Sequence, residues 1–193
     1  MRVIAGEFRS RRLKTPPGQD VRPTPDRLRE SLFSILSTQI AGVVFADLYA
    51  GCGSVGIEAL SRGASKCIFV ERGRQASAVL KENLASLGVA GRAQVIQGNA
   101  STYAASLAAE IVFLDPPFDR TEEYDKTLSQ LGERTGGIVI AQHASRFPLG
   151  EQYGRLRRYR QLRQGDNTLS FFVATAPAGE ASVAPASLER AIE

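Results

Sequence analysis

The residues best suited to chemistry lie where an apolar run, residues 111–114, ends in Asp115, Pro116, Pro117 and Phe118. Four apolar residues in a row are typical of a short strand that is buried on both faces. The two prolines cannot donate ladder hydrogen bonds, so the chain must turn off the sheet directly after the carboxylate. A carboxylate, proline carbonyls and an aromatic ring at one sheet edge can accept hydrogen bonds from an amino group while the ring stacks on a planar base. We predict a catalytic site at these four residues, although a plain strand end with a proline turn fits the motif alone equally well.

A second motif, at residues 51–56, reads Gly-x-Gly-x-x-Gly. It follows a predicted strand and opens a predicted helix, and Glu71 ends the next strand 20 residues after Gly51. This spacing is the dinucleotide-binding fingerprint, in which glycines permit a tight turn and the acid accepts hydrogen bonds from ribose hydroxyls. A dehydrogenase is therefore one interpretation.

The residues around this glycine motif favour a different ligand. Asp47 lies four residues before Gly51, where a carboxylate would repel a pyrophosphate but attract an ammonium group. No Tyr-Lys or His-based hydride-transfer pair is evident, and we interpret the single histidine, His143, as structural. S-adenosylmethionine fits better, because it carries an ammonium group, a sulfonium, a ribose diol and an adenine.

We assign the parts of this cofactor to particular side chains. Asp47 is expected near the methionine end, Glu71 at the ribose and Asn99 at the adenine edge, while the glycines permit close backbone approach. The complete predicted cofactor-binding set is Asp47, Ala50, Gly51, Gly53, Gly56, Glu71, Arg72, Asn99, Ala100 and Asp115.

Strands and helices alternate through most of the chain, which predicts a doubly wound α/β domain with a mostly parallel sheet. The strand-like stretches are residues 43–47, 66–70, 93–96, 111–114 and 138–141. A helix is expected before the first of them, with Thr24 as its cap and Pro25 at its first position. Two later stretches, 156–162 and 169–174, predict an antiparallel pair at the sheet edge, which gives seven strands in all.

Length and composition suit one domain with small additions. We predict a basic N-terminal β-hairpin and linker at 1–24, a catalytic domain at 25–175 and a disordered Ala/Pro/Ser-rich tail at 176–193. No apolar run approaches the ~18 residues that a membrane span needs, and the N-terminus lacks the apolar region of a signal peptide. Cys52 and Cys67 are interpreted as reduced thiols of a cytoplasmic protein, and no metal site is expected.

Basic residues gather in two clusters, in a chain whose net charge is +4 and whose pI is about 9.3. The first 14 residues carry five cations against one acid, Glu7, and a second cluster surrounds the start of the first helix. Such clusters suit the phosphates of a nucleic acid, although a solvated charged face is the alternative. Arginines at 155–163 fit either phosphate contact or protection of an edge strand. The predicted RNA-binding residues are Arg2, Arg9, Arg11, Arg12, Lys14, Arg22, Arg27 and Arg29.

Three further stretches carry a family resemblance: Arg-Val-Ile-Ala-Gly at 2–6, Arg-Pro-Thr-Pro-Asp-Arg-Leu-Arg-Glu at 22–30 and Glu-Ala-Leu-Ser-Arg-Gly at 58–63. With the glycine and Asp-Pro-Pro motifs, they resemble the RsmD family, and the resemblance covers the chain up to about residue 176. It implies a class I methyltransferase with a Rossmann-like fold that uses S-adenosylmethionine to methylate N2 of a guanine in 16S ribosomal RNA. The sequence departs from the family's commoner residues at Gln142, Phe118 and Asn99.

The resemblance also implies an assembling small ribosomal subunit as substrate, and we expect a monomer in the cytoplasm. Asp115 and a proline carbonyl would accept the two amine protons of the base, and Phe118 would stack on it. Two other interpretations stay open. One is an adenine-N6 or other nucleic-acid amine methyltransferase with the same motif, and the other is a non-catalytic RNA-binding assembly factor.

Overall fold

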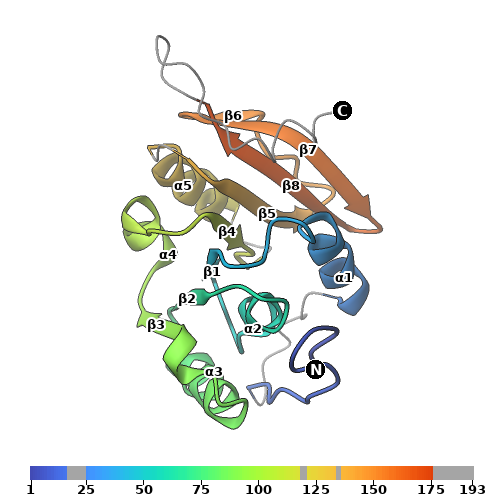
Figure 1. The fold of residues 1–193 in the computed structure, drawn as a ribbon. Coiled ribbons are helices and arrows are strands. Elements are labelled where there is room, and N and C mark those ends of the chain that lie inside the picture. Colours follow the sequence, from blue (N-terminus) through green and yellow to red (C-terminus); the bar gives the residue numbers. More distant parts are fainter. Residues whose placement is uncertain (17–24, 118–120, 134–135, 176–193) are drawn as a thin grey trace.

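The computed structural model describes residues 1–16, 25–117, 121–133 and 136–175. In these residues one eight-stranded sheet has the strand order β3-β2-β1-β4-β5-β8-β7-β6 (Figure 1). The strands are β1 Val44–Leu48, β2 Lys66–Glu71, β3 Ala93–Gln97, β4 Ile111–Leu114, β5 Ile138–Ala144, β6 Gln152–Tyr153, β7 Leu156–Gln164 and β8 Asn167–Ala174. The predicted mostly parallel α/β sheet with an antiparallel edge pair is confirmed. The count of seven strands was wrong, because the two-residue β6 pairs with the start of β7 and forms the outer edge.

Helices cover both faces of this sheet (Figure 1). They are α1 Asp26–Ile35, α2 Ser54–Ser61, α3 Arg74–Ser86, α4 Ala100–Tyr103 and α5 Thr121–Leu131. Apolar side chains of α1, α2 and α3 share one core with one face of the sheet, and those of α4 and α5 share a second core with the other face. No helix in the described part of the chain is long and apolar enough to cross a membrane.

Strands β1 to β5 are parallel, so their carboxyl ends share one edge. Strand β4 is buried along its whole length, as its uninterrupted apolar sequence requires. β8 then runs antiparallel to β5 from Asn167 onward, and this pairing extends β5 to Ala144, three residues beyond the prediction. Gly165, with φ +59°, makes the tight turn between β7 and β8.

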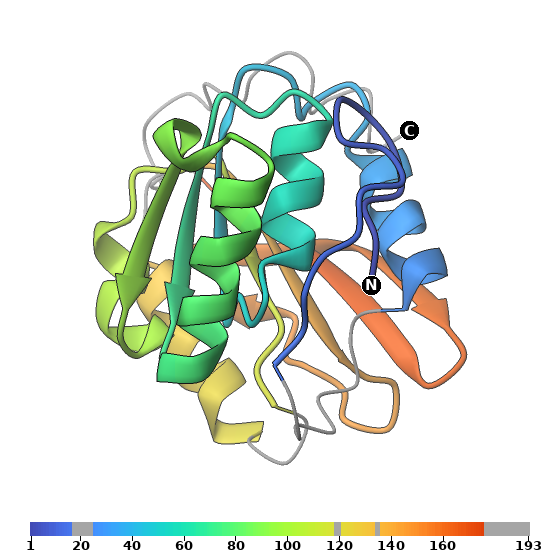
Figure 2. The same cartoon turned by 90° about the horizontal axis from the view of Figure 1, so that it is seen from below.

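The N-terminal segment, residues 1–16, folds back on itself as predicted, but as an irregular hairpin: Val3 N–H donates to the Arg11 carbonyl and Leu13 N–H to the Met1 carbonyl, both at 3.0 Å. It has a single isolated bridge, between Arg2 and Arg12, and no strand. Its side chains Val3, Phe8 and Leu13 are buried in the core shared with α1, α2 and α3. Figure 2 shows the segment beside α2 and α1. It is therefore part of the domain rather than a separate extension.

Side chains of α2 explain why the N-terminal segment has no regular strand ladder. The Glu58 carboxylate accepts the backbone N–H groups of Ile4 and Ala5 at 2.7 and 3.0 Å. Ser61 accepts the N–H of Phe8 and donates to the Ala5 carbonyl. These contacts use backbone groups that a hairpin ladder would need. Sequence patterning cannot anticipate them, because their partners lie more than 50 residues away.

Helix α1 begins one residue later than predicted, at Asp26. Pro25 is its N-cap and makes no side-chain capping hydrogen bond. The predicted cap Thr24 lies outside the described residues, as does the tail at 176–193.

Candidate active site

Three carboxylates lie at the carboxyl edge of the parallel strands. Asp47 is the penultimate residue of β1, Glu71 ends β2, and Asp115 follows β4 directly. Strand β1 pairs with β2 on one side and with β4 on the other. Asp47 at the end of β1 is therefore flanked by the strands that carry Glu71 and Asp115. The structure therefore brings together the acids of the glycine motif and of the Asp-Pro-Pro motif, as their strand-end positions predicted.

Asp47 is buried, with 2% of its surface exposed. Its Oδ2 accepts the backbone N–H of Gly56, in the first turn of α2, at 2.9 Å. Burial raises the pKa of Asp47 to about 7, helped by the charge of Glu71 and opposed by the Gly56 hydrogen bond. Asp47 thus ties the glycine loop to β1 and remains partly protonated near neutral pH.

The three glycines of the motif have different roles. Gly51 has φ +56°, and a Cβ there would meet no atom within 4 Å, so its backbone borders open space. Gly53, with φ +88°, forms the N-cap of α2. At Gly56 a Cβ would lie 2.3 Å from the Phe69 ring, so this glycine permits α2 to pack closely against β2. Of the three, Gly51 is therefore the one that leaves room for a ligand.

Glu71 is held beside that open space. Its Oε2 accepts the N–H of Gly51 at 2.8 Å, and its Oε1 accepts the N–H of Gly73 at 2.6 Å. The carboxylate is half-buried, so its orientation is fixed while part of it stays accessible. This is the arrangement that an acceptor for ribose hydroxyls needs.

The remaining predicted cofactor residues surround Glu71. Arg72 and Asn99 are exposed, and Asn99 is the N-cap of α4. Ala50 and Ala100 are buried, and the Ala50 N–H donates to the Val70 carbonyl at 3.0 Å. The two exposed side chains are available to a ligand, whereas the two alanines shape the loops beneath it.

The Asp-Pro-Pro turn is held by a tyrosine that the sequence did not single out. Asp115 is half-buried, Pro116 is buried and Pro117 is exposed. The Tyr124 hydroxyl, from α5, donates to the Gln142 carbonyl at 2.8 Å and lies 3.4 Å from the Pro116 carbonyl. Burial raises the pKa of Tyr124, so the phenol keeps its proton. The predicted stacking residue Phe118 lies outside the described residues.

A second tyrosine joins the cofactor loop to the same helix. Tyr49 follows β1 with φ +76°, a conformation that is rare for a non-glycine residue. Its hydroxyl contacts Thr127 at 2.8 Å and Glu123 at 3.1 Å, both in α5. α5 thus supports both loops of the site. Sequence reasoning missed the two tyrosines because aromatic residues in such positions look like ordinary core residues.

The structure corrects the prediction for Arg29. Its side chain is fully buried, and its Nη2 donates to the Arg2 carbonyl at 2.6 Å and to Asp26 at 3.0 Å. Arg29 therefore joins α1 to the N-terminal segment and cannot reach RNA. Only Nη2 makes these bonds, because Nε and Nη1 are buried without a hydrogen-bond partner among the described residues.

The other predicted RNA-binding residues lie at the surface where the structure describes them. Arg9, Arg12 and Arg27 are exposed. The remaining exposed cations make surface contacts: Arg2 with Asp26 at 3.8 Å, Lys14 with Glu82 at 2.8 Å, and Arg11 with the Ser86 carbonyl at 3.2 Å. Arg22 lies outside the described residues.

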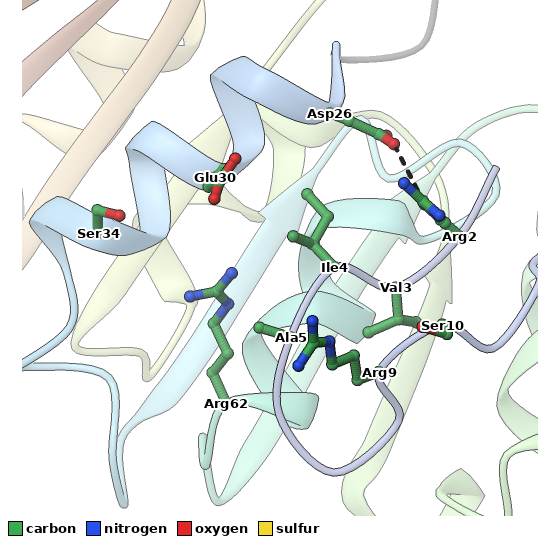
Figure 3. Close-up of a pocket in the computed structure, with 10 residues that line it drawn as sticks. All are labelled: Arg2, Val3, Ile4, Ala5, Arg9, Ser10, Asp26, Glu30, Ser34 and Arg62. Atoms are coloured by element: carbon green, nitrogen blue, oxygen red, sulfur yellow. Dashed lines mark ion pairs between the residues drawn. The ribbon is translucent and has the colours of Figure 1, made fainter.

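A cavity of about 450 Å³ lies between the N-terminal segment and α1 (Figure 3). Arg2, Arg9 and Arg62 line it together with the acids Asp26 and Glu30. None of the three strand-end carboxylates lines it. Its mixed charge and its position on the flank distinguish it from the candidate active site.

His143 is structural, as expected. It is 2% exposed, and its Nε2 is 2.9 Å from the Ser170 hydroxyl. Burial lowers the pKa of the imidazole, which keeps it neutral. Within the ranges that the structure describes, no three His, Cys, Asp or Glu side chains gather as metal ligands do.

Comparisons with known proteins find relatives that are named as methyltransferases. The family described as "Conserved hypothetical protein 95" matches residues 1–173. The putative rRNA methyltransferase YlbH of Bacillus subtilis is 35% identical over 86% of this chain and 94% of its own length. Ribosomal RNA small subunit methyltransferase D of Escherichia coli is 43% identical over 62% of this chain, and the match spans 61% of that protein. The solved structure of the putative methyltransferase yhhF of E. coli has a TM-score of 0.79 and 32% identity, covering 92% of this chain and 99% of that one.

Proposed function

Because this chain belongs to the RsmD family, we propose that it transfers a methyl group from S-adenosylmethionine to the N2 amine of a guanine in 16S ribosomal RNA. The observation that carries the proposal is the juxtaposition of a glycine loop held by Asp47 and Glu71 with the Asp115-Pro116-Pro117 turn. The first group suits the cofactor and the second suits an amine, and neighbouring strand ends place them together.

The cofactor fits the residues around Gly51. The open space at Gly51 permits a ligand to approach the backbone, and the fixed, half-buried Glu71 carboxylate suits the ribose diol. Asp47 lies beneath the loop, and an ammonium group placed near it would favour the ionised, negatively charged form of its carboxyl group. When bound, S-adenosylmethionine supplies an electrophilic methyl group on sulfur.

The Asp-Pro-Pro turn suits the acceptor amine. The lone pair of a guanine amine is delocalised into the ring, so the nitrogen is a poor nucleophile. Hydrogen bonds from its two protons to the Asp115 carboxylate and the Pro116 carbonyl would draw the lone pair out of the ring. When the nitrogen accepts the methyl group in exchange for a proton, Asp115 or water would take up that proton. Holding the two reactants in line supplies much of the rate.

The exposed cations of the N-terminal segment support an RNA substrate. Arg9 and Arg12 stand at the surface of a segment that is itself anchored in the core, so their charge has a fixed position. RNA phosphates are the polyanions that such a surface attracts. We propose an assembling small subunit as the form in which the RNA is presented.

Asp115→Asn tests the catalytic assignment. Asn keeps the size and suits the turn, but it replaces a charge-assisted hydrogen bond with a neutral one about half as strong. We expect near-normal cofactor affinity by calorimetry and a single-turnover methyl-transfer rate that is about 10²-fold lower, as for the loss of one electrostatic stabiliser. The substrate is small subunits from cells that lack this gene, and mass spectrometry of the RNA identifies the product as N2-methylguanosine.

Asp166→Asn is the matched control, because Asp166 is an exposed acid in the β7–β8 turn. This variant should methylate at the wild-type rate. A wild-type rate for Asp115→Asn would remove the carboxylate from the chemistry and leave the Pro116 carbonyl as the main acceptor.

A further inference from the structure

Gln142, in the second half of β5, has a buried polar atom with no partner. The residue is 2% exposed, and its side-chain Oε1 makes no hydrogen bond. Leaving a buried acceptor unpaired costs roughly 1–3 kcal/mol, so such an atom in a native fold calls for an explanation. The structural role of Gln142 needs only its backbone, which pairs with Leu169 of β8 and accepts the Tyr124 hydroxyl.

The register of the sheet places Gln142 beside the Asp-Pro-Pro turn. Leu114 pairs with Ala141 in the parallel β4–β5 ladder, so the next residues, Asp115 and Gln142, are neighbours at the edge. Both paired residues point into the core shared with α4 and α5. Side chains alternate along a strand, so that of Gln142 projects toward the opposite face. Ile138 and Ile140 confirm this alternation, since they lie in the core on that face.

Tyr124 fixes the distance between Gln142 and the turn. One phenol contacts the carbonyls of Gln142 and Pro116, so the end of β5 and the catalytic turn share an anchor. Three acceptors therefore lie at this edge of the sheet: the Asp115 carboxylate, the Pro116 carbonyl and the Gln142 side-chain carbonyl. A base that faces these three acceptors must carry several hydrogen-bond donors on its polar edge.

Guanine and adenine differ in this property. The Watson–Crick edge of guanine carries three donor hydrogens, one on N1 and two on N2. That of adenine carries two, on N6, and presents N1 as an acceptor. An acceptor beside the Asp-Pro-Pro turn would pair with guanine N1–H, whereas it would face the lone pair of adenine N1.

We propose that Gln142 reads the target base, with its side-chain carbonyl accepting the N1–H of guanine while Asp115 and Pro116 hold N2. This inference rests on the proposed function and names the residue that selects guanine over adenine. Because the amide is buried, the base must leave its stack and enter the sheet edge to reach it, as in other enzymes that act on a base.

The experiment removes the proposed hydrogen bond between Gln142 and guanine N1–H, first by changing the base and then by changing the residue. After mass spectrometry has mapped the methylated guanosine, small subunits are reconstituted with RNA that carries either guanosine or 2-aminopurine riboside at that position. 2-Aminopurine keeps the amine but has no N1 hydrogen. Single-turnover methyl transfer to both substrates is measured for the wild type, for Gln142→Met, which keeps the length without the amide, and for Gln142→Glu, which accepts but does not donate.

We expect the wild type to prefer guanosine by roughly 10- to 100-fold, the range for leaving a buried hydrogen-bonding group unpaired. Gln142→Met should lose most of this preference, and Gln142→Glu should keep or increase it. A variant that is merely misfolded slows on both substrates, which leaves the ratio unchanged, so the ratio isolates the Gln142–N1 pair.

The possible outcomes separate this inference from the function on which it rests. A guanosine preference that Gln142→Met retains, or that Gln142→Glu abolishes, overturns the role of Gln142 and leaves the methyltransferase assignment standing. Absence of N2-methylguanosine with the wild-type enzyme overturns the proposed function itself.

Discussion

The raised pKa of Asp47 gives a prediction about stability. The carboxyl group has a pKa of about 7 in the fold against 3.8 as a free side chain, chiefly because it is buried. Between these two values the folded protein holds the proton while the unfolded chain releases it. The raised pKa therefore makes its full contribution to the free energy of unfolding below about pH 4. This contribution falls as the pH rises to about 7, and above that the free energy no longer changes with the titration of Asp47. The shift of about three units corresponds to roughly 4 kcal/mol.

Asp47→Asn removes this dependence, because an amide does not titrate and its oxygen can still accept the Gly56 N–H. We expect the stability of the variant relative to the wild type to rise by roughly 2.5 kcal/mol between pH 5 and pH 8. Urea denaturation of both proteins at several pH values measures the difference. Asp166→Asn, which changes an exposed carboxylate, should give a curve parallel to the wild type. A parallel curve for Asp47→Asn would show that Asp47 is ionised in the fold at all these pH values and would refute the reasoning.

The same group also reports on the cofactor. An ammonium group placed near Asp47 favours the carboxylate, so binding of S-adenosylmethionine should release close to one proton at pH 6. Calorimetry in buffers with different ionisation enthalpies counts the protons released. Tight binding without proton release would contradict the placement of the ammonium group near Asp47, and Asp47→Asn should bind without release in either case.

Two further variants test the ligand surfaces. Glu71→Ala should weaken the binding of S-adenosylmethionine by roughly 1.5–3 kcal/mol in calorimetry, the value of a charge-assisted hydrogen bond. Thermal unfolding is the control for the fold, and unchanged affinity would take Glu71 out of the site. Arg9→Gln with Arg12→Gln should spare cofactor affinity, weaken RNA binding and reduce the salt dependence of log K by about one unit or more. Lys66→Gln, at the opposite end of β2, is the matched control, and equal binding by all three proteins would identify the arginines as a solvated face.

Features that depend on local sequence were predictable. The central strands of the parallel sheet are largely apolar runs, and the glycine and Asp-Pro-Pro motifs sit at strand ends because their residues cannot continue a strand. The positions of Asp47, Glu71 and Asp115 at one edge follow from parallel pairing alone. These parts of the candidate site required no knowledge of distant contacts.

Features that depend on distant partners were not predictable. Arg29 looks like a surface cation in an amphipathic helix, and only the Arg2 carbonyl and its neighbours reveal that it is buried. Tyr124 follows a helical pattern of core residues, and its anchoring role requires β5 and the catalytic turn on either side of its hydroxyl. The N-terminal segment pairs its two arms as predicted, but contacts with α2 keep the pairing irregular. In each case the local sequence fits two structural roles, such as a surface or a buried position for an arginine. The tertiary contacts decide which of the two the residue takes.

Helix α2 links the two ligand surfaces of the proposed enzyme. At its start, the Gly56 N–H is held by Asp47, so the helix fixes the glycine loop relative to β1. One turn later, the buried Glu58 carboxylate accepts two N–H groups of the N-terminal segment and the Arg62 Nε at 2.7 Å. The same short helix therefore sets the position of the cofactor loop and of the segment that carries Arg9 and Arg12. If those arginines hold RNA as proposed, the distance between a bound phosphate and the cofactor is set by α2 rather than by a flexible arm. Basic residues on an anchored segment can then contribute to positioning the base as well as to affinity.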